Sequence, residues 1–132
     1  MKAYQALFDM AATVREHSYS PISHFKVGAA LMTAHGTCYA GTNVEDAGFN
    51  STTHAEQSAI AVMVAEEGRQ VVKRIVVVSD SSAAPCGHCR QLLLEFAKPD
   101  MEIIVASPDG TIRLDTKLSV LIPHAFRMDD FC

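Results

Sequence analysis

The run Ile75-Val76-Val77-Val78 constrains the fold more than any other segment, because it is continuous and β-branched with no polar position. A strand of this kind is covered on both faces, whereas a strand with one solvated face alternates apolar and polar residues. The chain must therefore supply helices to both sides of one sheet. We expect a layered α/β domain with a central sheet between helices.

Three segments have the pattern of helices. Apolar residues recur at helical spacing over residues 2–17, and residues 53–67 are apolar on several faces. A third helix is expected from Pro85 to about Phe96, where Lys98-Pro99-Asp100 should end it. Residues 42–52 are polar and rich in Gly and Asn, which predicts a loop, and the apolar tail at 117–126 is expected to be irregular.

Five segments have the pattern of strands, and turn signatures such as His35-Gly36 and Pro108-Asp109-Gly110 lie between them. The expected strands are residues 25–33, 37–41, 75–78, 103–106 and 111–114. The length suits one unit, since two would each bury too small a core. We therefore predict a single catalytic domain over residues 1–132, built as three α/β/α layers around a five-stranded mixed sheet.

Charge and hydropathy exclude several classes of partner. The chain has 11 Lys and Arg, 15 Asp and Glu, and a net charge of −4, with no basic cluster longer than Lys73-Arg74. A protein that grips a phosphate backbone needs a positive stripe, so we expect no nucleic-acid partner. No apolar run is long enough to span a membrane, and no export signal is seen, so we expect a cytoplasmic protein.

The chemistry is concentrated in two short segments, Thr53-His54-Ala55-Glu56-Gln57 and Pro85-Cys86-Gly87-His88-Cys89. Zinc prefers thiolate and imidazole ligands, and a catalytic zinc site has three protein ligands and one open position. His54, Cys86 and Cys89 form such a set. The cysteines are three residues apart in a first helical turn, so they share a face. Free N–H groups there should lower the pKa values of the two thiols.

Glu56 is the candidate catalytic residue. A glutamate beside the metal, but not bound to it, can move protons to and from water whose pKa the metal lowers to about 7. The alternative is a capping box, in which Thr53 and Glu56 only satisfy N–H groups at a helix start. Cys86 and Cys89 alone would equally suit a redox pair or a structural zinc site.

The joint pattern is more specific than its parts. His54-x-Glu56, a spacer from residue 57 to residue 84, and Pro85-Cys86-x-x-Cys89 together resemble the signature of zinc deaminases. The resemblance is closest to the cytidine deaminases of nucleoside salvage. It extends to residues 25–31 (FKVGAAL), to Asn43-Val44-Glu45, and to residues 121–126 (LIPHAF), so it covers most of the chain.

The resemblance implies a reaction and a set of roles. The protein would deaminate cytidine and deoxycytidine with one Zn²⁺ per chain, and it would be a homotetramer or a dimer. Asn43 and Glu45 would accept hydrogen bonds from the ribose hydroxyls, and Phe25 would line the pocket. The carbonyls near Ala55 and in residues 82–84 would accept from the exocyclic amine of the base. Phe126 would pack on the pyrimidine ring in a neighbouring subunit's site.

Two departures from the small tetrameric members occur together. Where those members carry Cys-Ala-Glu-Arg, this chain has His54-Ala55-Glu56-Gln57. Two thiolates and a neutral imidazole balance the charge of Zn²⁺, so no arginine is needed at position 57. The wording resembles the larger dimeric subtype, although 132 residues leave no room for its second domain. Arg90 is expected either near the thiolates, where it would tune their charge, or on the surface of its helix.

Three other functions remain open on the sequence. The substrate could be another aminated base or nucleoside analogue. The chain could be a zinc-stapled binding module without catalysis, in which Glu56 would have no chemical task. A redox domain built on Cys86 and Cys89 is the third alternative, although it would give His54 and Glu56 no purpose.

Overall fold

A computed structural model describes residues 4–131, which include one sheet of five strands in the order β2-β1-β3-β4-β5. The strands are β1 (Gly28–Thr33), β2 (Cys38–Thr42), β3 (Val72–Val78), β4 (Ala97–Ala106) and β5 (Ile112–Lys117). Only β3 and β4 are parallel, and the other neighbouring pairs are antiparallel. The predicted five-stranded mixed sheet is therefore confirmed.

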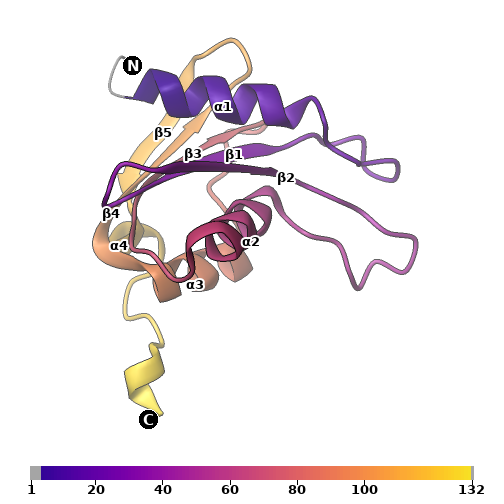
Figure 1. Ribbon diagram of the computed structural model, residues 1–132. Helices are drawn as coiled ribbons and strands as arrows, with labels where there is room; N and C mark the ends of the chain where they lie inside the picture. Colours follow the sequence, from indigo (N-terminus) through magenta and orange to yellow (C-terminus); the bar gives the residue numbers. More distant parts are fainter. Residues whose placement is uncertain (1–3, 132) are drawn as a thin grey trace.

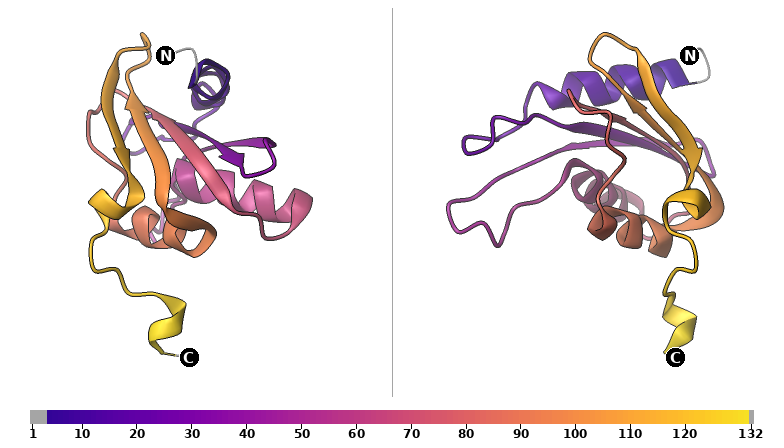
Figure 2. Two further views of the ribbon diagram at one scale, coloured as in Figure 1. Left: turned by 90° about the vertical axis from the view of Figure 1, so that its left-hand side faces the viewer. Right: turned by 180° about the vertical axis from the view of Figure 1, so that it is seen from behind.

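Helices cover both faces of this sheet (Figure 1). The helix α1 (Gln5–Arg15) lies on one face, and α2 (Ala55–Glu67), α3 (Gly87–Phe96) and the short α4 (Leu118–Leu121) lie on the other. Two apolar cores result, one beneath α1 and a larger one beneath the other three helices. The edge-on views in Figure 2 show the same three layers, with the C-terminal segment extending away from them.

The strand β3 shows why two covered faces were required. Ile75 and Val77 point into the core beneath α2 and α3, whereas Val76 and Val78 point into the core beneath α1. All four side chains are at most 5% exposed. Side chains of a strand alternate between faces, so a run with no polar position places apolar groups in both cores. The strand is longer than expected and begins at Val72.

The structure corrects the interpretation of Lys98-Pro99-Asp100. These residues do not form a break after α3, because β4 begins directly at Ala97 and continues through them. The register shifts between the pairs Val72–Ala97 and Arg74–Glu102, so the strand bulges where the proline stands. A bulge is one of the few places where a strand tolerates proline, which lacks the N–H for the ladder.

The ends of the chain also differ from the expectation. The first helix covers Gln5–Arg15 rather than residues 2–17, of which residues 2 and 3 lie outside the described part. The tail is not wholly irregular, because α4 forms within it and buries Leu118 completely. Burial in the larger core stabilises a single turn that local propensity would not maintain.

Glycine allows two close approaches between layers. A Cβ atom on Gly28 would lie 1.9 Å from the carbonyl oxygen of Ala11 in α1. A Cβ atom on Gly41 would lie 2.3 Å from the backbone nitrogen of Ala59 in α2. The strand β1 and the edge strand β2 thus pack directly against helix backbone, which positions the loop that follows β2.

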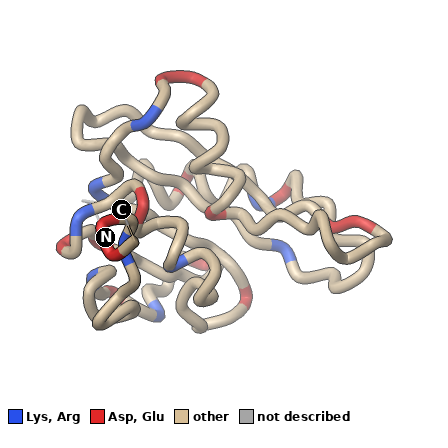
Figure 3. Tube along the Cα trace, turned by 90° about the horizontal axis from the view of Figure 1, so that it is seen from below, with Lys and Arg blue, Asp and Glu red and all other residues tan. Residues whose placement is uncertain are grey.

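Charges are dispersed over the fold (Figure 3). Within residues 4–131, the tube shows short basic and acidic stretches interspersed along the chain. None of the helices in that part of the chain is long and apolar enough to cross a membrane.

Candidate active site

Two helix starts form a candidate metal centre. His54 is the residue before α2 and Cys86 is the residue before α3, while Cys89 lies in the first turn of α3. His54 Nδ1 is 3.2 Å from Cys89 Sγ and 3.3 Å from Cys86 Sγ. The ligand atoms of all three residues lie within 4.8 Å of one another. The three predicted ligands are therefore brought together, although 31 residues separate His54 from Cys86.

The donor set fits zinc. Imidazole nitrogen and thiolate sulfur on a tetrahedral zinc ion would be about 3.5 Å apart, close to the two separations seen here. Cys86 and Cys89 are both free thiols, and no disulfide competes for them. Three protein ligands leave a fourth position for a small molecule, which is the pattern of catalytic zinc sites.

The expected lowering of the thiol pKa values does not apply to Cys89. Burial raises the pKa of this thiol, and the nearby Glu56 carboxylate and Cys86 raise it further. The helix start contributes one N–H, from Cys89 to Cys86 Sγ at 3.5 Å. The helix start therefore does not by itself maintain a thiolate at Cys89, and a cation between the ligands would be needed to do so.

Glu56 is not a capping residue, so that alternative is wrong. The helix cap consists of His54 and Gln57, because the Gln57 side-chain oxygen accepts a hydrogen bond from the His54 N–H at 2.7 Å. This leaves the Glu56 carboxyl free to face Cys89 and a neighbouring cavity, with only 6% of the residue exposed. Burial raises the pKa of Glu56, which brings the carboxyl nearer to the range where it can exchange protons at neutral pH.

His54, Cys86 and Cys89 together form the metal cradle. A cavity of about 330 Å³ opens beside this cradle and is lined by 16 residues. Its volume lies at the lower end of the range for small-molecule sites. His54, Glu56 and Cys86 line one part of the wall, together with Ala55. The rest comes from the segment after β3, the end of β3, the loop after β2 and the segment before β1, namely Ala83, Ala84, Pro85, Ser79, Ser81, Val77, Asn43, Glu45, Thr52, Ser23, Phe25 and Val27.

Asn43 differs from the expected acceptor. Its Oδ1 accepts from Ser18 Oγ at 2.6 Å and from the Val27 N–H at 3.0 Å, so both acceptor positions are in use. Its Nδ2 donates to the Phe25 carbonyl at 2.7 Å, which leaves one N–H of the amide without a protein acceptor among these bonds. Asn43, which lines the cavity, therefore keeps a donor and not an acceptor free for a ligand.

Glu45 presents the complementary group. Its Oε1 accepts from the N–H groups of Ile22 and Ser23, and its Oε2 accepts from Ser23 Oγ. These bonds, led by the Ser23 hydroxyl, lower the pKa of Glu45, so the carboxylate stays charged. Three bonds leave one of about four acceptor positions open. Donor and acceptor thus lie side by side on the same loop.

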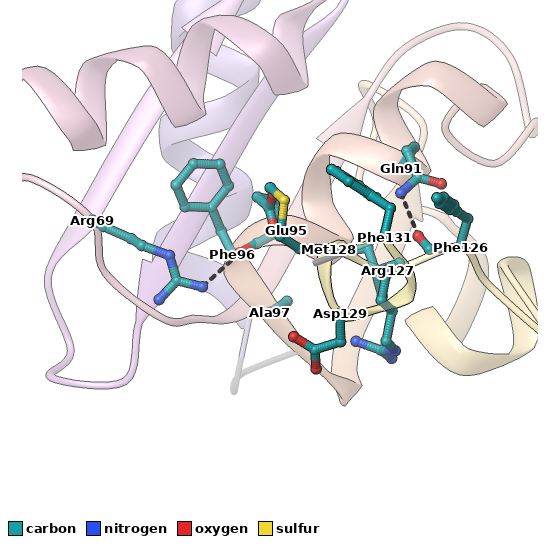
Figure 4. Close-up of a pocket in the computed structure, with 11 residues that line it drawn as sticks. Arg69, Gln91, Glu95, Phe96, Ala97, Phe126, Arg127, Met128, Asp129 and Phe131 are labelled. Atoms are coloured by element: carbon teal, nitrogen blue, oxygen red, sulfur yellow. Dashed lines mark hydrogen bonds between the residues drawn. The ribbon is translucent and has the colours of Figure 1, made fainter.

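Phe126 is the one proposed substrate residue that lies away from this cavity. It borders a larger hollow of about 790 Å³ between the end of α3, the start of β4 and the C-terminal segment (Figure 4). Gln91 of α3 donates to the Phe126 carbonyl at 2.8 Å, and the phenyl ring is about half exposed. Phe25, Asn43, Glu45 and Ala55 all line the first cavity.

Three roles were not foreseen from the sequence. Ser18 and Ser23 orient Asn43 and Glu45 from more than 20 residues away, and no spacing rule links such distant positions. Arg90 neither contacts the thiolates nor lies free on the surface. Its guanidinium donates to the Pro85 carbonyl at 2.6 Å and to the Leu121 carbonyl at 2.8 Å. It therefore ties the segment before Cys86 to the end of α4.

Comparison with known proteins assigns the family. Residues 1–106 match the model of the cytidine and deoxycytidylate deaminase zinc-binding region. The chain therefore belongs to the zinc-dependent family of cytidine and deoxycytidylate deaminases. The fold and the cradle of His54, Cys86 and Cys89 agree with this assignment.

Relatives of two sizes match nearly all of the chain. A cytidine deaminase of Halalkalibacterium halodurans is 37% identical over 128 residues, which are 96% of each chain. A cytidine deaminase of Vibrio vulnificus is also 37% identical, over 95% of this chain but only 39% of the longer relative. The crystal structure of cytidine deaminase from Burkholderia pseudomallei has a TM-score of 0.86 and 37% identity, and the match covers 93% of this chain and 98% of that one.

Proposed function

We propose that this protein catalyses the hydrolytic deamination of cytidine and deoxycytidine to uridine and deoxyuridine, with release of ammonia, as a zinc-dependent enzyme of pyrimidine salvage. The observation that carries the proposal is the cluster of His54 Nδ1, the Cys86 and Cys89 thiols and the buried Glu56 carboxyl, of which His54, Cys86 and Glu56 line the cavity. The relatives named cytidine deaminase support the choice of substrate.

His54, Cys86 and Cys89 would hold one Zn²⁺. When bound, this ion lowers the pKa of a water molecule to about 7 and so supplies a nucleophile at neutral pH. Glu56 takes a proton from the attacking water and gives a proton to the ring nitrogen next to the amine-bearing carbon. It then takes the proton of the hydroxyl group that has been added to this carbon and transfers it to the amine, which leaves as ammonia while the carbon becomes a carbonyl. A raised pKa suits a group that must both accept and donate in one cycle.

The other end of the cavity suits a sugar. The free N–H of Asn43 can donate to one ribose hydroxyl oxygen, and the open acceptor position of Glu45 can take the hydroxyl proton. Phe25 and Ala55 would border the nucleoside between the sugar and the base. We propose these four residues as the substrate-binding set, with Phe126 reaching the site of another subunit.

A nucleoside is favoured over a nucleotide by charge. The 16 residues that line the cavity include two acids, Glu45 and Glu56, and no lysine or arginine. A phosphate group placed there would meet negative charge without a cation to pair with. We therefore propose that deoxycytidylate is a poor substrate.

We further propose that the chain acts as a single domain in a cytoplasmic homotetramer, with a dimer as the alternative. The C-terminal segment extends from the body, and its Phe126 ring is about half exposed (Figure 2). Thiolate ligands suit a reducing compartment, where cysteines stay free to bind metal. The mass of the particle in solution distinguishes four chains from two.

The test is the loss of ultraviolet absorbance of cytidine, followed together with ammonia release, in the metal-loaded protein. Deoxycytidine, deoxycytidylate, adenosine and guanine serve as comparison substrates. We expect turnover of cytidine and deoxycytidine, and we expect this turnover to be lost when a chelator removes the metal. Activity on a purine alone would refute the substrate assignment.

The variant Glu56→Gln separates catalysis from metal binding. We expect its turnover to fall at least about a hundredfold, because proton transfer by a positioned group contributes this much or more. Zinc content should stay near one per chain, since Glu56 is not a ligand. A variant that keeps wild-type turnover would contradict the assigned role, and a protein that binds no zinc would contradict the whole proposal.

A further inference from the structure

The segment just before β1 lies against the loop that carries Asn43 and Glu45. The Tyr19 N–H donates to the Asn43 carbonyl at 3.2 Å, and the Glu45 N–H donates to the Tyr19 carbonyl at 2.9 Å. These two backbone bonds place residues 20–25 over the Glu45 side chain. The segment can therefore control how the carboxylate faces the cavity.

Ser23 makes three hydrogen bonds that orient the Glu45 carboxylate and join it to the neighbouring backbone. Its Oγ donates to Glu45 Oε2 at 2.5 Å, and its N–H donates to Glu45 Oε1 at 3.1 Å. The same Oγ accepts from the Phe25 N–H at 3.0 Å. The hydroxyl proton is thus committed to Glu45, and one side chain links the carboxylate to the backbone of Phe25. Ser23, Phe25 and Glu45 all line the cavity.

The hydrogen bonds to the Glu45 carboxylate leave one acceptor position open, on Oε2. Oε1 is filled by two backbone N–H groups, from Ile22 and Ser23, and Oε2 is half filled by the Ser23 hydroxyl. Without the hydroxyl, the carboxylate would be held only through Oε1, and no protein donor named here would act on Oε2, which carries the free acceptor position. That acceptor position would then be less firmly oriented.

We propose that Ser23 is a positioning residue for the sugar of the substrate, and that its hydroxyl holds Glu45 so that the remaining acceptor position meets a ribose hydroxyl. This inference rests on the proposed function, because it takes Glu45 as the sugar-binding group. Ser23 itself need not touch the substrate. Its effect therefore depends on a sugar hydroxyl being present.

The experiment compares Ser23→Ala, which lacks the hydroxyl, with Ser23→Thr, which keeps it. Ser23 is exposed, so both side chains fit without repacking a core. Ser119→Ala, at an exposed position in α4, is the control. Each variant is assayed with cytidine and with 2′,3′-dideoxycytidine, which has the same base but lacks both hydroxyls.

We expect Ser23→Ala to raise KM for cytidine roughly tenfold with little change in kcat, the loss expected for one hydrogen bond to a charged group. With 2′,3′-dideoxycytidine, kcat/KM should change less than about twofold, and Ser23→Thr should resemble the wild type. In a Glu45→Ala background, Ser23→Ala should have no further effect, since coupled residues are not additive.

Three results would overturn the inference. They are an equal loss with both substrates, a fall in kcat at constant KM, and a full tenfold effect that persists without Glu45. If the wild-type protein fails to turn over cytidine, the proposed function itself is wrong. If the wild type is active and Ser23→Ala is unchanged, only the role of Ser23 is refuted.

Discussion

Arg90 offers a direct test of how the metal cradle is held in place. Its guanidinium donates Nε to the Pro85 carbonyl at 2.6 Å and a terminal nitrogen to the Leu121 carbonyl at 2.8 Å. Pro85 precedes the ligand Cys86, and Leu121 ends α4, so one side chain joins the cradle to the tail. Neither carbonyl bond involves a zinc ligand, so the effect on metal binding must be indirect.

The expected cost of Arg90→Ala follows from these two bonds. A hydrogen bond from a charged group contributes about 1.5–3 kcal/mol. Because Arg90 is only partly buried and water can replace some of each bond, we expect a loss of about 2–3 kcal/mol in the free energy of unfolding. For a domain of this size, that corresponds to a fall of about 10 °C in Tm. Arg90→Lys should lose about half as much, since an ammonium is a compact group that lacks the planar fork.

The assays are thermal unfolding of the zinc-loaded protein and the rate of zinc transfer to a chromogenic chelator. We expect faster zinc release from Arg90→Ala, because the segment at Pro85 loses its anchor. Arg113→Ala is the control, since Arg113 is an exposed arginine of β5 whose Nε donates to Ser107 Oγ and not to the segment before Cys86. A loss below about 1 kcal/mol, or zinc release at the wild-type rate, would refute the reasoning.

Two further predictions concern stability. Gly28→Ala should lower the free energy of unfolding by at least about 3 kcal/mol, because the new Cβ would meet the Ala11 carbonyl. The control Gly87→Ala places its Cβ where no atom lies within 4 Å, so it should change this free energy by less than about 1 kcal/mol. Chemical denaturation measures both. Hydrogen bonding to Arg74 lowers the pKa of Glu102, so this carboxylate stabilises the fold above the ordinary glutamate range and loses that contribution as the pH falls below about 4.5. In Glu102→Gln, the free energy of unfolding should fall by about 1 kcal/mol less on acidification than in the wild type. The same fall in both proteins would contradict the assignment of this effect to Glu102.

Local sequence patterns were enough to predict the layers of the fold and the ligands of the metal site. The unbroken run Ile75-Val76-Val77-Val78 required two cores, because alternating side chains of an apolar strand enter both faces. The spacing of Cys86 and Cys89 placed both sulfurs on one helix face, and the choice of imidazole and thiol groups indicated zinc. These inferences depend on local geometry, which a linear pattern encodes.

Which polar groups remain free for a ligand depends on long-range contacts in the folded chain. Asn43 and Glu45 were named from the sequence, but the long-range bonds from Ser18 and Ser23 make one a donor and the other a single-site acceptor. Gln57 takes the cap that would otherwise have engaged Glu56. Such outcomes depend on contacts between residues distant in the chain, and hydrogen bonding is a competition that only the folded arrangement resolves.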